Sequence, residues 1–264
     1  MIDDLQSVLF ETGDDHVATI TLNRPHALNS FDLRMIDEFE MLWRHIALDD
    51  DIHAVVLRAA AGQAFSTGMD VRGPSPVSNV ANIWSQVDPG QRLAPKAMGC
   101  WKPVIAAVHG MCAGGAFYWL NESDIIICSE DATFFDPHVT YGMVAALEPI
   151  GLSHKIGLHE VLRMALLGND ERIGAQTALR IGLVTEVTSD VALWPRAHAL
   201  ARAIAEKPAA AVQGTLRAIW EALDMNRSSA LQSALKYTQL GNPIGKAEVD
   251  RPAIMAKAKT FDVR

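Results

Sequence analysis

Two adjacent glycines, Gly114 and Gly115, mark the segment of this sequence best suited to chemistry. They follow an apolar run from Val104 to Val108 that predicts a buried strand, and they precede residues of helical composition. Glycine at such a junction lets a ligand approach the backbone closely. The first N–H groups of a helix point outward at the positive end of its dipole. The pattern therefore predicts a place where backbone amides bind an anion or a developing oxyanion.

The elements that would hold this junction are strands alternating with helices. Strand-like apolar runs occur at Val17 to Leu22, Ala54 to Leu57, Val104 to Val108, Ile125 to Cys128 and Leu183 to Val187. Between the first two runs, a helix is predicted from Ser30, its expected N-cap, to Leu48. Its apolar residues recur at helical spacing: Met35, Ile36, Phe39, Leu42, Trp43 and Ile46. Strands alternating with helices predict an α/β architecture with right-handed crossovers.

The composition excludes several classes of protein. The 264 residues include 49% hydrophobic residues, enough for a large core, and carry a formal net charge of −8 with no lysine or arginine run. This balance argues against nucleic-acid binding. No apolar run is long enough to cross a membrane, and the acidic N-terminal residues lack a signal-peptide core. We therefore expect a soluble, cytoplasmic protein with no nucleic-acid or membrane partner.

The cysteines and histidines give no sign of a metal site. Cys100, Cys112 and Cys128 follow no ligand or disulfide spacing, which fits a reducing cytosol. His154 and His159 have no third ligand at a telling spacing. Cys112 lies close to the glycine pair, so it is either a nucleophile or a small buried hydrophobic side chain.

A second glycine-containing bend, Phe65-Ser66-Thr67-Gly68-Met69-Asp70, follows the strand-like run that ends at Leu57. With the first bend it resembles the paired F-x-x-G-x-D and G-G-x signature of the crotonase (enoyl-CoA hydratase/isomerase) superfamily. The resemblance spans about residues 15 to 210 and continues, in the family's order, through LNRPHALNS, KPVIAAV and LLGNDERIGAQTALRIGLVTEV.

The resemblance implies a fold and an assembly. The fold would be a crotonase-type spiral of ββα units, within the α/β class. Residues 1–195 would form the spiral core with the CoA and acyl pocket, and residues 196–264 a helical oligomerisation region. The assembly would be a homotrimer or a dimer of trimers.

The resemblance also assigns binding roles. The amides of Met69 and Gly115 would donate to the thioester carbonyl of an acyl-CoA and stabilise an enolate or oxyanion. Gly68 and Gly114 would let the backbone approach the ligand. A further set would lie beside the nucleotide end of CoA: Arg24, His26 and Ala27. CoA would be part of the substrate, and no separate cofactor is expected.

The acid/base positions depart from the family's hydratases, which place one glutamate three residues after the second glycine and another twenty residues later. This sequence has Tyr118 and His138 there, so both carboxylates are absent. An imidazole with a pKa of about 6.5 can act at neutral pH, whereas a phenol with a pKa of about 10 is a poor base. Glu148 follows His138 by ten residues and either stabilises a helix N-terminus or serves as a displaced acid/base.

Two hypotheses remain open. The first is an acyl-CoA-processing enzyme of fatty acid metabolism, a lyase or isomerase near the enoyl-CoA hydratases/isomerases, with an acid/base set other than the glutamate pair. The alternative is a CoA-thioester-binding homologue with little or no turnover. Acyl specificity is expected to lie in the irregular residues 73–99, which contain four prolines.

Overall fold

The computed structural model describes residues 4–73, 88–256 and 263. Most of the segment expected to set acyl specificity, 74–87, lies outside the described residues, as do most of the residues after 256. The chain forms two compact units, Met1–Ile204 and Ala205–Arg264, which are considered separately.

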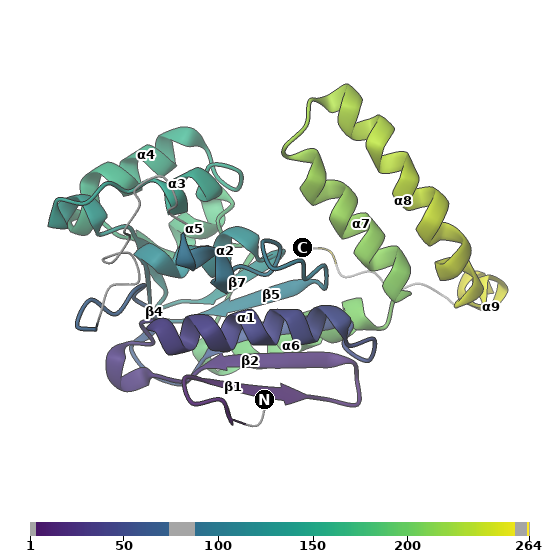
Figure 1. Cartoon of the computed structure of the whole chain (residues 1–264), viewed down its shortest axis with the longest axis horizontal. Helices are drawn as coiled ribbons and strands as arrows, with labels where there is room; N and C mark the ends of the chain where they lie inside the picture. Colours follow the sequence, from purple (N-terminus) through teal and green to yellow (C-terminus); the bar gives the residue numbers. More distant parts are fainter. Residues whose placement is uncertain (1–3, 74–87, 257–262, 264) are drawn as a thin grey trace, which may run out of the picture. The chain divides into compact units, whose positions relative to one another are not determined.

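Two sheets form the frame of the first unit (Figure 1). The larger sheet has the order β1 (Val8–Thr12), β2 (Val17–Leu22), β3 (Ala54–Ala59), β5 (Val104–Val108), β7 (Ile125–Ser129) and β10 (Glu186–Thr188). Only β1 is antiparallel to its neighbour. The smaller sheet has the order β4 (Ala64–Ser66), β6 (Met111–Ala113), β8 (Thr133–Phe135) and β9 (Ile173–Gly174), and its first three strands are parallel.

The chain visits the two sheets in alternation. β3 is followed by β4, β5 by β6 and β7 by β8, so each turn of the chain adds one strand to each sheet. The orders β3-β5-β7 and β4-β6-β8 therefore match, which is the geometry of a spiral of ββα units. The predicted fold class is confirmed. The last predicted strand was misplaced: Leu183 and Val184 are buried residues that precede β10.

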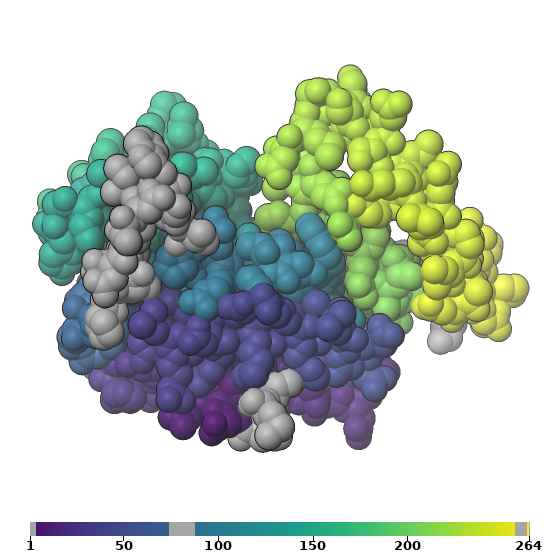
Figure 2. Space-filling model, in the orientation of Figure 1, coloured from purple at the N-terminus to yellow at the C-terminus, as the bar shows by residue number. Residues whose placement is uncertain are grey.

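Helix α1 (Leu33–Leu48) covers one face of the first unit, where its residues form a continuous band (Figure 2). All six apolar residues predicted for its inner face are fully buried. The predicted N-cap is wrong. Asp32 is the N-cap and accepts a hydrogen bond of 2.9 Å from the Met35 amide, while the Ser30 hydroxyl donates to the Ala27 carbonyl. A carboxylate at this position complements the helix dipole.

Four shorter helices and α6, which is as long as α1, complete the described part of the first unit. They are α2 (Phe117–Glu122), α3 (Leu147–Leu152), α4 (Leu158–Leu167), α5 (Ala175–Ile181) and α6 (Asp190–Ala205). Short 3-10 turns connect them, among them η3 (Pro89–Leu93), η4 (Gly114–Ala116) and η5 (His138–Tyr141). The predicted helix after the glycine pair is confirmed, because η4 leads directly into α2.

The second unit contains α7 (Ala209–Ala222), α8 (Arg227–Ala247) and α9 (Arg251–Ala256). Pro208 is the N-cap of α7. Small residues let α7 and α8 approach closely, since a Cβ at Gly241 would lie 3.2 Å from the Ala210 carbonyl oxygen. Several large apolar side chains on these helices stay exposed: Ile219, Leu223, Leu231, Leu235, Leu240 and Ile244.

Candidate active site

The two glycine bends predicted from the sequence meet in space. A Cβ added to Gly68 would lie 2.7 Å from the Gly115 nitrogen and 3.0 Å from the Ala113 carbonyl oxygen, and Gly68 has a φ of +83°. Only glycine fits both this backbone conformation and this close contact. Gly115 is equally confined, because a Cβ there would lie 2.7 Å from the ring of Phe31.

The backbone around Met69 directs the Met69 amide away from the paired segment that contains Phe31. Met69 pairs with Phe31 in a parallel bridge. The Phe31 amide donates to the Gly68 carbonyl, and the Asp70 amide donates to the Phe31 carbonyl, both at 2.8 Å. In this pattern the bonds are made by the residues flanking Met69, so its own N–H points to the other side. Gly115 is the second residue of η4, where a helix leaves its N–H without an intrahelical acceptor.

Most of the predicted site residues line one cavity of about 1180 Å³. These are the predicted oxyanion donors, the three predicted acid/base residues and part of the predicted CoA-binding set: Met69, Gly115, Tyr118, His138, Glu148, Gly114, His26 and Ala27. Arg24 and Gly68 are the two predicted residues that do not belong to its described lining. The structure therefore brings together segments from five separate parts of the sequence.

His138 is held by a buried carboxylate two residues earlier in the chain. Oδ1 of Asp136 lies 2.5 Å from His138 Nδ1 and also accepts a 3.0 Å hydrogen bond from the His138 amide. Asp136 is 1% exposed, and its Oδ2 is buried without a hydrogen-bond partner among the described residues. The Nδ1–H tautomer that Asp136 selects leaves Nε2 as the free nitrogen of the ring. The hydrogen bond to Asp136 raises the pKa of His138, against the opposing effect of burial.

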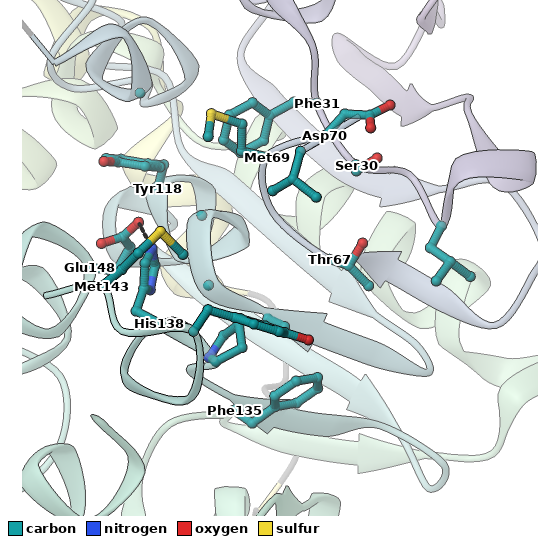
Figure 3. Close-up of a pocket in the computed structure, with 18 of the residues that line it drawn as sticks. Ser30, Phe31, Thr67, Met69, Asp70, Tyr118, Phe135, His138, Met143 and Glu148 are labelled. Carbon is teal, nitrogen blue, oxygen red and sulfur yellow. Dashed lines mark ion pairs between the residues drawn. The ribbon is translucent and has the colours of Figure 1, made fainter. Parts of the chain in front are cut away.

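Glu148 faces this free nitrogen. Figure 3 shows the two side chains pointing toward each other, with 3.8 Å between His138 Nε2 and Glu148 Oε1. Glu148 is 7% exposed, and burial raises the pKa of its carboxyl group. The sequence left open whether Glu148 only stabilises the start of α3; the structure shows a carboxyl group within ion-pair distance of the imidazole.

The imidazole of His138 also lies next to the glycine pair. A Cβ at Gly114 would be in contact with His138 Cε1 at 3.6 Å and with Pro137 Cδ at 3.4 Å. An imidazole, which can exchange a proton near neutral pH, therefore lies beside the turn that contains the Gly115 amide. The arrangement combines hydrogen-bond donors for an oxyanion with an acid/base group at its side.

Tyr118 lies above this pair in Figure 3 and is half-buried. Burial, and then the charges of Glu148 and Asp88, raise the pKa of the Tyr118 phenol well above its usual range. The phenol therefore stays neutral, as a hydrogen-bond donor or acceptor rather than a base.

Arg24 is already engaged by carboxylates. Its Nη2 lies 3.0 Å from Asp70 Oδ2 and 3.2 Å from Asp32 Oδ2, and its Nη1 donates to the Ser30 carbonyl. These contacts tie the bend that contains Met69 to the start of α1. The role of Arg24 beside the phosphates of CoA stays a prediction, as do those of His26 and Ala27.

Other side chains at the cavity were not singled out by the sequence. Arg172 places its guanidinium 4.2 Å from the centre of the Phe135 ring, and Asp88 and Gly90 line the cavity next to Tyr118. Arg172 lies within a segment that carries the family resemblance, and Asp88 and Gly90 lie within residues 73–99, the segment expected to set acyl specificity, although neither was named individually. Cys112 is fully buried, and burial raises the pKa of its thiol, so it is a core side chain rather than a nucleophile. The described residues contain no cluster suited to a metal ion.

Comparison with solved structures identifies the class to which this fold belongs. An enoyl-CoA hydratase/isomerase from Mycobacterium paratuberculosis matches with a TM-score of 0.80 and 34% identity, over 95% of this chain and 93% of that one. An enoyl-CoA hydratase from Bacillus anthracis matches with a TM-score of 0.82 and 24% identity, over 94% and 93% of the two chains. The fold is that of the crotonase superfamily.

The family within this class follows from the sequence as a whole. The model described as Enoyl-CoA hydratase/isomerase matches residues 12–255, and the chain belongs to this family. (E)-benzylidenesuccinyl-CoA hydratase of Thauera aromatica is 34% identical over 228 residues, 86% of each chain. The mitochondrial Delta(3,5)-Delta(2,4)-dienoyl-CoA isomerase of Mus musculus is 30% identical over 221 residues, 80% of this chain and 67% of that one. The protein is an acyl-CoA-processing enzyme of the hydratase/isomerase type.

Proposed function

We propose that this enzyme binds the thioester carbonyl of an acyl-CoA between the amides of Met69 and Gly115 and moves a proton with His138. The enolate or oxyanion that forms would accept hydrogen bonds from both amides, which need no reorganisation during the reaction. His138 Nε2 would take up and return the proton, with Asp136 holding the ring. Glu148 would complete an acid/base set that differs from the family's usual glutamate pair, and Tyr118 would serve it as a neutral hydrogen-bonding group.

The observation that carries this proposal is the position of His138. Its ring is fixed by buried Asp136, lies against Gly114 and faces Glu148 across 3.8 Å. Two proton-exchanging groups this close in one cavity are what a lyase or isomerase needs to add and remove protons at carbon atoms near the thioester. The relatives include a hydratase and an isomerase.

A binding measurement tests the proposal directly. Acyl-CoA thioesters should bind more tightly than free acids of the same chain, and free CoA should bind through its nucleotide end. Isothermal titration calorimetry with crotonyl-CoA, crotonic acid and CoA checks this order. Absence of binding for every CoA species at millimolar concentration would refute the proposal. Binding without turnover of a panel of enoyl-CoA esters would instead favour the CoA-thioester-binding homologue.

We further propose that the enzyme self-associates as a homotrimer or a dimer of trimers through the region 196–264, on a CoA-binding core formed by residues 1–195. The exposed apolar side chains of α7 and α8 support this, because such surface is usually covered by a partner. Light scattering should give three or six times the mass of one chain; a monomer would contradict the assembly.

We also propose a cytoplasmic location, supported by three buried cysteines that form no disulfide. Among the described helices, none has the length and apolar character needed to span a membrane.

A further inference from the structure

A rigid turn lies against the side chain of Tyr118. Asp88 is the N-cap of η3 (Pro89–Leu93), and its Oδ1 accepts a 3.0 Å hydrogen bond from the Gly90 amide. The far end of the turn is attached to α1. Trp43 Nε1 donates to the Leu93 carbonyl at 2.8 Å, and Arg92 pairs with two carboxylates of α1, Asp37 at 2.7 Å and Glu40 at 2.8 Å. The start of η3 is therefore capped by Asp88, and its far end is attached to α1.

Gly90 leaves the space in which the Tyr118 ring lies. A Cβ added to Gly90 would be 2.3 Å from Tyr118 Cζ, 2.4 Å from Cε2 and 2.7 Å from Cε1. Such distances are impossible, so any side chain at position 90 would displace the hydroxyl end of the ring. Gly90 is not among the glycines with a positive φ. Its backbone conformation is therefore open to other residues, and the restriction at this position is purely one of space.

Among the described residues, the Tyr118 ring has the cavity as its open side. Its backbone is anchored, because the adjacent residues Phe117 and Trp119 are 1% and 0% exposed in the core. The ring of Phe31 stands edge-on to it, with 6.5 Å between the ring centres. The remaining side is the cavity that Tyr118 lines together with Gly90 and Glu148.

We propose that the Asp88–Gly90 turn is a positioning element that sets the width of the acyl pocket by letting Tyr118 lie back against it. Tyr118 is then the residue that determines how bulky an acyl group fits beside His138 and Glu148. The inference rests on the proposed function, because it concerns the same acyl pocket. It gives Tyr118 a role that a glutamate at this position would not have. The neutral aromatic ring forms a wall of the pocket, and the position of the ring depends on Gly90.

Gly90→Ala tests this by pushing the ring into the pocket. Calorimetry with free CoA, butyryl-CoA and benzoyl-CoA gives three dissociation constants for each variant. Overpacking should weaken benzoyl-CoA binding by about tenfold or more and butyryl-CoA binding less, with free CoA unchanged within about twofold. Gly157→Ala is the matched control, since a Cβ there meets no atom within 4 Å and Gly157 has no positive φ. It should leave all three constants unchanged.

A double variant separates an effect on the position of the Tyr118 ring from a general loss of structure. In a Tyr118→Ala protein the ring is absent, so Gly90→Ala should have no further effect on benzoyl-CoA binding. Asp88→Ala should weaken benzoyl-CoA binding as Gly90→Ala does, and Asp88→Asn, which keeps an acceptor for the Gly90 amide, should restore it.

The two failures are distinguishable. Equal effects of Gly90→Ala with and without the Tyr118 ring, or an unchanged ratio of benzoyl-CoA to free-CoA affinity, would overturn the positioning role. Loss of binding to every CoA species in the unaltered protein would instead contradict the proposed function.

Discussion

Gly68→Ala is expected to lower kcat by about 10²–10³ on whichever acyl-CoA the unaltered enzyme turns over fastest. The added methyl group would lie 2.7 Å from the Gly115 nitrogen. The two bends must then separate, and the amides of Met69 and Gly115 can no longer converge on one oxygen atom. Because this interaction strengthens in the transition state, kcat should fall more than KM rises. Steady-state kinetics, with thermal unfolding measured in parallel, checks the expectation.

Gly182→Ala is a closely matched control for this substitution. Gly182 has a φ of +84°, almost identical to the +83° of Gly68, but a Cβ at Gly182 meets no atom within 4 Å. Both variants force alanine into the left-handed region, which costs roughly 1–2 kcal/mol. Only Gly68→Ala disturbs the paired amides. Equal kcat values for the two variants at similar stability would show that the convergence of the two bends has no part in the reaction.

The glycine bends illustrate how much of the site the sequence predicts. Two short local patterns, each a strand followed by glycine, mark the bends, and the family resemblance assigns Met69 and Gly115 within them; the structure places both residues at one cavity. The long apolar runs similarly predict β2, β3, β5 and β7 within one or two residues. Strands of a parallel sheet are buried on both faces, so they appear in the sequence as nearly continuous apolar runs.

The second sheet was not predictable in the same way. Its strands β4, β6 and β8 have three residues each, too few to show an alternating pattern. The pairing of these strands depends on the spiral path of the chain rather than on their own composition. Asp136 illustrates the same limit at the site. The sequence shows Asp136 two residues before His138. Its burial and its hydrogen bond to His138 Nδ1 depend on the tertiary structure.

Contacts between distant segments are the least predictable part of the site. Glu148 faces His138 because η5 and the start of α3 fold back toward one another, and no periodic pattern marks that return. Gly90 and Tyr118 belong to separate elements whose contact depends on the attachment of η3 to α1. The space that Gly90 leaves by having no side chain can be recognised only once the position of the Tyr118 ring is known.

His138→Ala should lower kcat by about 10²–10⁴ and change KM much less, because in the proposed mechanism the imidazole transfers the proton and does not hold the substrate. Glu148→Gln keeps the shape of the side chain and should cause a smaller loss, since Glu148 faces His138 Nε2 at 3.8 Å without replacing it. His154→Ala is the control histidine variant, because His154 is exposed and does not belong to the described lining of the cavity. It should retain full activity.

The pH dependence of kcat separates the two possible bases. If His138 is the base, the active form is the neutral imidazole, so the rate rises with pH as His138 loses its proton. The hydrogen bond to Asp136 raises the pKa of His138, which places the midpoint above the ordinary value of about 6.5. Asp136→Asn removes this charge while the burial that lowers the pKa remains. The midpoint should therefore move to lower pH, with a reduced kcat because the ring is held less firmly.

If Glu148 is the base instead, the order of the losses reverses. Glu148→Gln would then be the more damaging change, and the midpoint would follow a carboxyl group whose pKa burial raises from its usual acidic range. Asp136→Asn would remove a neighbouring negative charge that raises the pKa of Glu148. Both hypotheses thus predict a midpoint that moves to lower pH, and the shift alone does not decide between them. The decisive comparison is the loss of kcat in His138→Ala against that in Glu148→Gln. Full activity in both folded variants would exclude this pair from the chemistry.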